Sequence, residues 1–276
     1  MSPSPHPSFA FLHGFGGRRS QWDEVRQLLG DPPALALALA GHEGPSPGNS
    51  FLSEVDRIAL QLSQRGEGPW HLVGYSLGGR LALGLLARHR DLFAGATLLG
   101  AHPGLESEAH RRQRREDDEI WARRLEAEGI DAFFDAWGQR PLFAKTQSEN
   151  HRAQLLDMRR GLDPAALAAA LRAFSPAAMP RWEGALPGLP LPLTFVAGER
   201  DEKFVGLAQR MASLAPQGEA IVVPGAGHNV VLEAPEAVAQ ILRQAAPSRH
   251  PAPPATANVL LGALLPTLAG APPRSS

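Results

Sequence analysis

The fold is decided by Leu72-Val73-Gly74-Tyr75-Ser76-Leu77-Gly78-Gly79-Arg80. This stretch contains the G-x-S-x-G pattern, which places a serine on a sharp turn between a buried strand and a helix. Glycines surround the serine because neighbouring backbones come too close at such a turn for Cβ atoms. The apolar residues 70–73 predict the strand, and the leucines after Arg80 predict the helix. Because the turn exposes a hydroxyl group, the sequence indicates an enzyme.

Short apolar runs alternate with helical patterns along the rest of the chain. This alternation predicts an α/β fold with a mostly parallel sheet flanked by helices. The first predicted strand begins at Phe9, which leaves no room for a hairpin ahead of it, so we expect the N-terminal hairpin to be missing. The predicted strands are 9–12, 34–39, 71–73, 94–99, 193–197 and 220–223.

The alternation is interrupted between residues 104 and 190, where helical patterns such as 106–128 and 164–173 replace strands. We interpret 104–190 as a helical cap inserted into a core formed by 8–103 and 191–246. A final helix is expected at 235–244. Residues 247–276 are rich in proline and alanine, and we expect a disordered tail.

The composition is that of an ordinary globular protein, with 276 residues, 43% hydrophobic and 20% charged, and a net charge of -1. This balance gives no general attraction to nucleic acid or to an anionic membrane, so we expect neither as a partner. The absence of cysteine excludes disulfides and thiolate metal sites. No secretory signal or membrane-length apolar run is present, which favours a cytoplasmic protein. We expect no metal and no cofactor, and the sequence leaves the oligomeric state open.

A serine hydroxyl is a weak base and nucleophile until an imidazole takes its proton, and a carboxylate must hold that imidazole in place. In folds with this turn, the acid and then the histidine follow the serine, each in a loop after a strand. Asp201 follows the predicted strand 193–197, and His228 follows 220–223. We therefore predict a catalytic triad of Ser76, Asp201 and His228.

Two details support this choice of partners. His228 lies in Gly225-Ala226-Gly227-His228-Asn229, where glycines allow the sharp approach that the imidazole needs. Glu199 is the alternative acid, but Asp201 lies beyond the end of the strand and its shorter side chain suits a fixed imidazole.

Reactions of carbonyl compounds need N–H donors at the oxygen that becomes negative. This kind of fold supplies the N–H after the serine and another from the loop after the first strand. We predict that Leu77 and Phe15 provide this oxyanion hole. Phe15 lies in the glycine-rich stretch Leu12-His13-Gly14-Phe15-Gly16-Gly17.

Together these motifs resemble those of the 2-succinyl-6-hydroxy-2,4-cyclohexadiene-1-carboxylate synthases, a branch of the α/β-hydrolase superfamily. The resemblance implies an α/β-hydrolase fold with a helical cap. One loop departs from the pattern, because similar enzymes usually carry Gly-His-Gly where this chain has Gly41-His42-Glu43-Gly44, and we assign that loop no part in the chemistry. The matching segments are 13–17 with Trp22, 74–80, 100–105, 137–143, 198–204 and 226–229.

The resemblance implies a lyase of menaquinone biosynthesis that eliminates pyruvate from 2-succinyl-5-enolpyruvyl-6-hydroxy-3-cyclohexene-1-carboxylate. Ser76 would then act as a general base on a ring proton, without an acyl-enzyme. The substrate is a small polycarboxylate, and carboxylates are best bound by arginine. The resemblance implies that Arg80, Arg114 and Arg159 bind substrate, with Arg111, Arg115 and Arg160 as alternatives, and that Tyr75 and Trp137 line the cavity.

Arg80 has a further reason to bind an anion. It lies one turn into the helix that follows Ser76, where the positive helix terminus opposes a cation. An anionic ligand close to Arg80 would relieve that unfavourable placement.

Two other functions could use the same residues. A carboxylesterase or thioesterase would use the triad covalently, although a cavity lined by arginines disfavours neutral esters. A binding module without activity would not need both a triad and an oxyanion loop, so the presence of both disfavours this function. The sequence therefore favours the lyase.

Overall fold

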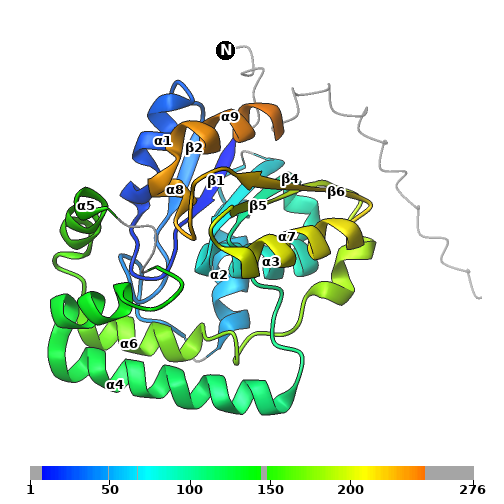
Figure 1. Ribbon diagram of the computed structural model, residues 1–276. Coiled ribbons are helices and arrows are strands. Elements are labelled where there is room, and N and C mark those ends of the chain that lie inside the picture. Colours follow the sequence, from blue (N-terminus) through cyan, green and yellow to red (C-terminus); the bar gives the residue numbers. More distant parts are fainter. Residues whose placement is uncertain (1–7, 49, 67, 144–147, 246–276) are drawn as a thin grey trace, which may run out of the picture.

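A computed structural model describes residues 8–48, 50–66, 68–143 and 148–245, and the expected tail at 247–276 lies outside these ranges. In the described chain, six strands form one parallel sheet in the order β2-β1-β3-β4-β5-β6 (Figure 1), which confirms the predicted α/β fold. The strands are β1 (Phe9–Leu12), β2 (Ala34–Leu37), β3 (Trp70–Tyr75), β4 (Phe93–Leu99), β5 (Pro192–Gly198) and β6 (Gln217–Val223).

Helices cover both faces of the sheet, and a separate hydrophobic core lies between sheet and helices on each face. Successive side chains of a strand point to opposite faces. In β1, Ala10 and Leu12 therefore pack on one side, whereas Phe9 and Phe11 pack on the other. The first face carries α2 (Phe51–Ser63), α3 (Leu77–Arg88) and α7 (Glu202–Leu214), and the second carries α1 (Asp23–Leu28), α8 (Val230–Glu233) and α9 (Pro235–Ala245). Short 3₁₀ turns lie at η1 (Arg19–Trp22), η2 (Arg90–Leu92) and η3 (Glu183–Gly188).

Three helices lie between β4 and β5: α4 (Glu108–Gly138), α5 (Glu149–Arg159) and α6 (Pro164–Ala173). Helices α4 and α6 build a separate small core. Figure 1 shows α4 and α6 side by side, away from the sheet. The break at Gly129, with φ 78° and ψ -175°, divides α4 into two helices. In a straight helix, Trp121 and Trp137 would be about 24 Å apart. Their ring centroids are 5.1 Å apart, so the second half of α4 folds back on the first.

The parallel strands all end at the same edge of the sheet, which is where sites form in such folds. Ser76 directly follows β3, and the loops after β1, β5 and β6 carry Phe15, Asp201 and His228. None of the helices in the described ranges combines the length and the apolar character needed to cross a bilayer.

Candidate active site

Ser76 occupies a strained turn between β3 and α3. Its φ of 50° and ψ of -103° lie in a region that costs a non-glycine residue about 1–3 kcal/mol. The turn is possible because glycines stand at its closest approaches. A Cβ on Gly74 would lie 2.5 Å from the Gly78 carbonyl oxygen, and a Cβ on Gly78 would lie 2.2 Å from that of Leu12. The sequence-based explanation of these glycines is therefore correct.

Ser76, His228 and Asp201 form a continuous hydrogen-bonded chain. His228 Nδ1 donates to Asp201 Oδ2 at 2.7 Å, and the Ser76 hydroxyl lies 3.1 Å from His228 Nε2. Because the carboxylate fixes the proton on Nδ1, Nε2 is free to accept the serine proton. Glu199, the alternative acid, is exposed and instead accepts a hydrogen bond from the Gly225 N–H at 2.8 Å.

Aromatic rings enclose the imidazole of His228 on several sides. The ring centroid of Phe204 lies 4.6 Å away, and those of Tyr75 and Phe143 each lie 5.6 Å away. Gly100 leaves room for the imidazole, since a Cβ there would lie 2.9 Å from His228 Cε1. These contacts limit the rotation of the base.

Two backbone N–H groups next to Ser76 are left for a ligand. In the loop after β1, the N–H groups of Gly14, Gly16 and Gly17 donate to Gln21, His42 and the Gly14 carbonyl. The Phe15 N–H has no acceptor among the described residues, and neither does the Leu77 N–H at the start of α3. Donors in this arrangement can stabilise a developing oxyanion.

A cavity of about 480 Å³ lies between the sheet edge and the cap helices. Every residue predicted for the site lines it: Ser76, Asp201, His228, Phe15, Leu77, Arg80, Arg114, Arg159, Tyr75 and Trp137. The structure therefore brings the cap arginines and the triad to one space. Burial raises the pKa of Tyr75 far above its usual value, so its hydroxyl stays protonated.

The three predicted arginines have different surroundings. Arg80 donates to the Phe174 carbonyl, and burial together with Arg114 lowers its pKa to about 9. Arg159 lies over the Phe134 ring with its Cζ 3.7 Å from the ring centroid, and burial lowers its pKa to about 10. Both remain charged at neutral pH. Arg114 instead pairs with the buried carboxylate of Asp118 at 2.8 Å.

Comparison with known proteins agrees with this geometry. The sequence pattern of the Alpha/beta hydrolase family matches residues 9–241. A 2-succinyl-6-hydroxy-2,4-cyclohexadiene-1-carboxylate synthase of Enterobacter sp. (strain 638) is 38% identical, over 86% of this chain and 91% of its own. The chain belongs to this synthase family of α/β hydrolases.

Solved structures place this family member among both synthases and esterases. MenH from S. aureus superposes with a TM-score of 0.81 at 27% identity, covering 87% of this chain and 92% of its own. A thermophilic esterase from Thermogutta terrifontis, with malate bound, gives a TM-score of 0.72 at 26% identity, covering 86% and 88%. The shared scaffold alone therefore does not separate the two reaction types.

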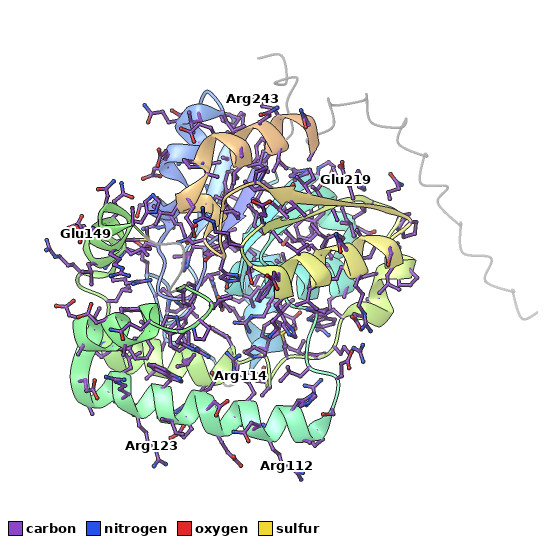
Figure 2. All side chains as sticks on the ribbon, in the orientation of Figure 1. Arg112, Arg114, Arg123, Glu149, Glu219 and Arg243 are labelled. Atoms are coloured by element: carbon purple, nitrogen blue, oxygen red, sulfur yellow. The ribbon has the colours of Figure 1, made fainter. Side chains whose placement is uncertain are left out.

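Three other arginines were alternatives for substrate binding in this synthase family member, and their contacts lie outside the cavity. Arg111 donates to backbone carbonyls including that of Met179, Arg115 pairs with Glu108, and Arg160 pairs with Asp157. None of the three lines the cavity. In Figure 2, Arg114 is labelled between α4 and the core, whereas Arg112 and Arg123 point away from it.

Sequence reasoning missed six polar residues that line the cavity: Gln21, His102, Arg140, Ser175, Lys203 and Asn229. His102 follows β4 and Lys203 follows β5, so their position after strands at the same edge was an available signal. In the described part of the chain, no group of three His, Asp or Glu side chains could hold a metal ion.

The loop after β2 lies closer to the site than we expected. His42 Nε2 accepts a hydrogen bond from the Gly16 N–H at 3.0 Å, and its Nδ1 donates to the Ala40 carbonyl. Nε2 can accept this bond only in the neutral ring, and burial lowers the pKa of His42 to about 3. The loop of Phe15 is thus anchored by a residue to which we had assigned no role.

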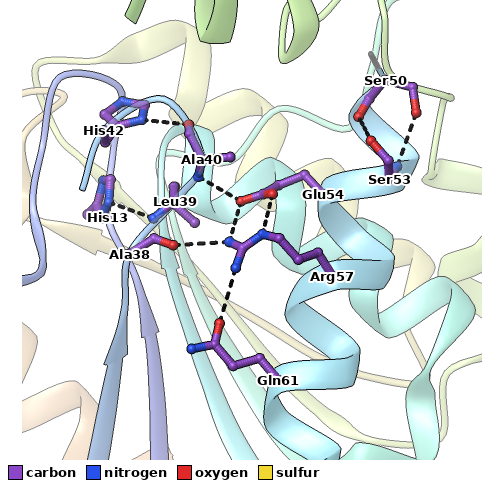
Figure 3. A network of polar contacts seen from close by, with 10 residues as sticks. All are labelled: His13, Ala38, Leu39, Ala40, His42, Ser50, Ser53, Glu54, Arg57 and Gln61. Atoms are coloured by element: carbon purple, nitrogen blue, oxygen red, sulfur yellow. Dashed lines mark hydrogen bonds and ion pairs between the residues drawn. The ribbon is translucent and has the colours of Figure 1, made fainter. Parts of the chain in front are cut away.

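Helix α2 in turn fixes the loop that carries His42 (Figure 3). Buried Glu54 accepts from the Ala40 N–H at 3.0 Å and pairs with Arg57 at 2.7 Å, while Arg57 donates to the Ala38 carbonyl at 3.0 Å. Next to it, His13 Nε2 accepts from the Leu39 N–H at 3.3 Å. A continuous set of hydrogen bonds therefore connects α2 to the oxyanion loop.

Proposed function

We propose that this chain eliminates pyruvate from 2-succinyl-5-enolpyruvyl-6-hydroxy-3-cyclohexene-1-carboxylate to form 2-succinyl-6-hydroxy-2,4-cyclohexadiene-1-carboxylate. Its relatives carry the name of this activity. The observation that carries the proposal is the pairing, in one cavity, of a Ser-His-Asp triad with arginines that have no carboxylate partner among the described residues.

The triad supplies the base. The Ser76 hydroxyl gives its proton to His228 Nε2, and Asp201 stabilises the imidazolium that results. The serine oxygen can then take the proton at C2 of the ring, which is acidic because it neighbours the succinyl ketone. The ketone oxygen becomes negative, and the N–H groups of Phe15 and Leu77 are the donors that would stabilise it.

The electron pair of the C2–H bond then moves through the ring. It forms C2=C3, the former C3=C4 pair forms C4=C5, and the C5–O bond breaks. The leaving enolpyruvate takes up the proton and becomes pyruvate. Atoms balance without water or an acyl-enzyme, so the serine needs no covalent bond to the substrate.

The charges of the cavity match this substrate better than a neutral ester. Arg80 and Arg159 are half-buried cations, and a buried charge without a partner is costly. A substrate with three carboxylates would satisfy them, while Tyr75 and Trp137 would contact the ring. A neutral ester would leave both guanidinium groups unpaired.

The test is pyruvate release from enzymatically generated substrate, with wild-type protein beside Ser76→Ala and with a nitrophenyl ester as a second substrate. We expect fast pyruvate release that falls about 100-fold or more in Ser76→Ala, with little ester cleavage. Ester turnover without pyruvate release would instead identify a carboxylesterase.

A further inference from the structure

The cavity holds one more guanidinium than the family resemblance implies. Arg140 lies just after the second half of α4 and lines the cavity. Its Cζ lies 4.3 Å from the ring centroid of Trp137 and 5.4 Å from that of Trp121. Guanidinium groups stack on aromatic faces while keeping their N–H donors available at the edge. The two indoles therefore orient Arg140 without using its hydrogen bonds.

An arginine that already pairs with a carboxylate of the protein attracts an anionic ligand less strongly than an arginine without such a partner. Arg114 already has Asp118 at 2.8 Å, a carboxylate that is itself buried. By contrast, no carboxylate in the described residues lies within ion-pair distance of Arg80, Arg140 or Arg159. Burial and the neighbouring charge of Arg114 lower the pKa of Arg140, as expected for a cation without an anion beside it.

From these contacts we infer that Arg140 binds a carboxylate of the substrate and is, with Arg80 and Arg159, one of three guanidinium groups in the cavity without a carboxylate partner, in addition to the Lys203 ammonium group. This inference rests on the proposed function for its ligand, since that substrate has three carboxylates. Arg114 can still donate hydrogen bonds next to Arg140, but the Asp118 carboxylate offsets part of its charge. Arg140 is then a determinant of specificity for one of these three carboxylates.

The test compares Arg140→Gln with Arg124→Gln. Arg124 provides a matched control, because its Cζ lies 5.7 Å from the same Trp121 ring but it pairs with Glu128 and does not line the cavity. Loss of a charged hydrogen bond predicts a KM for pyruvate release about 10- to 100-fold higher in Arg140→Gln, with kcat close to wild type. Arg124→Gln should match wild type in both constants.

A KM for Arg140→Gln equal to that of the control would overturn the inference, and so would a loss confined to kcat. If Arg140→Gln fails to fold, Arg140→Lys keeps the cation on the indoles but removes the planar fork, and its KM should also rise.

Calorimetry with citrate as a tricarboxylate probe separates this inference from the proposed function. Weaker citrate binding in Arg140→Gln than in Arg124→Gln would support the anion site even if wild type released no pyruvate. Equal citrate binding and equal KM in an active enzyme would reject the site and leave the proposed function intact.

Discussion

Asp201 and Glu199 lie two residues apart, yet the imidazole can use the carboxylate of only one of them. Asp201 Oδ2 lies 2.7 Å from His228 Nδ1, whereas Glu199 binds the Gly225 N–H at the surface. We expect Asp201→Asn to lower kcat for pyruvate release about 10²- to 10⁴-fold, because the imidazolium loses its counter-charge. Glu199→Gln should stay within about twofold of wild type, as surface substitutions do. The reverse ranking of the two variants in steady-state kinetics would make Glu199 the acid.

The sequence was sufficient to predict that Ser76, His228 and Asp201 lie together, because the fold fixes both their order and their places after strands. It was not sufficient to predict which arginines are paired. The Arg114–Asp118 pair has the i,i+4 spacing of a helix, but whether that face is buried depends on where the cap lies. The position of Arg140 on Trp121 and Trp137 depends on a helix reversal that residue spacing does not reveal.

At the scale of elements, the cap helices α4 and α6 illustrate what local signals can and cannot predict. Helix α6 was predicted with its observed bounds, because Asp163 caps it through the Ala165 N–H and Pro164 starts it. For α4 the expected end at residue 128 coincides with the break at Gly129. The second half was missed, since its aromatic residues Phe133, Phe134 and Trp137 are buried by tertiary contacts.

The loop after β2 provides a prediction at the same scale, because it positions the oxyanion loop through a single side chain. His42 holds the Gly16 N–H at 3.0 Å, and α2 holds His42 in place through Glu54. Loss of a complete oxyanion donor costs about 10²- to 10³-fold in kcat. We expect His42→Ala to lower kcat by less, about tenfold, because Phe15 keeps its N–H but loses its orientation.

His42→Gln is the rescue variant for this loop. Its amide oxygen can accept from Gly16 in place of Nε2, so kcat should recover most of the loss while KM remains constant in both variants. A rise in KM without a change in kcat would show that His42 affects substrate binding rather than the orientation of Phe15.

At the scale of the whole molecule, the sheet order follows from parallel strands joined by helices, but the edges of the sheet were predicted least well. Strand β6 was expected at 220–223 and begins at Gln217, because its first residues are polar and partly exposed on an edge. Strand β2, at the other edge, ends at Leu37 rather than at 39. Edge strands carry a weaker apolar signal than strands that are buried on both faces.

The folded molecule as a whole should be sensitive to mild acid, because it holds several histidines in the neutral form. Burial lowers the pKa of His13 and His71 to about 4, and that of His42 and His102 to about 3. In the unfolded chain a histidine titrates near 6.5. Between pH 6.5 and 4 the unfolded chain therefore binds protons that the folded protein does not, so the free energy of unfolding falls as pH falls.

The size of this effect is comparable to the stability of a typical protein. Each of the four histidines contributes a loss of about 2 kcal/mol at pH 5, against a total of about 5–15 kcal/mol. We expect the midpoint of thermal unfolding to drop steeply between pH 6.5 and pH 5. His71→Phe should reduce the pH slope of stability by about 1.4 kcal/mol per pH unit. The ring nitrogens of His13, His42 and His102 accept hydrogen bonds from backbone N–H groups, which requires neutral rings. A midpoint of thermal unfolding that stays constant from pH 7 to pH 5 would contradict this prediction, because it would mean that the folded protein binds these protons as readily as the unfolded chain.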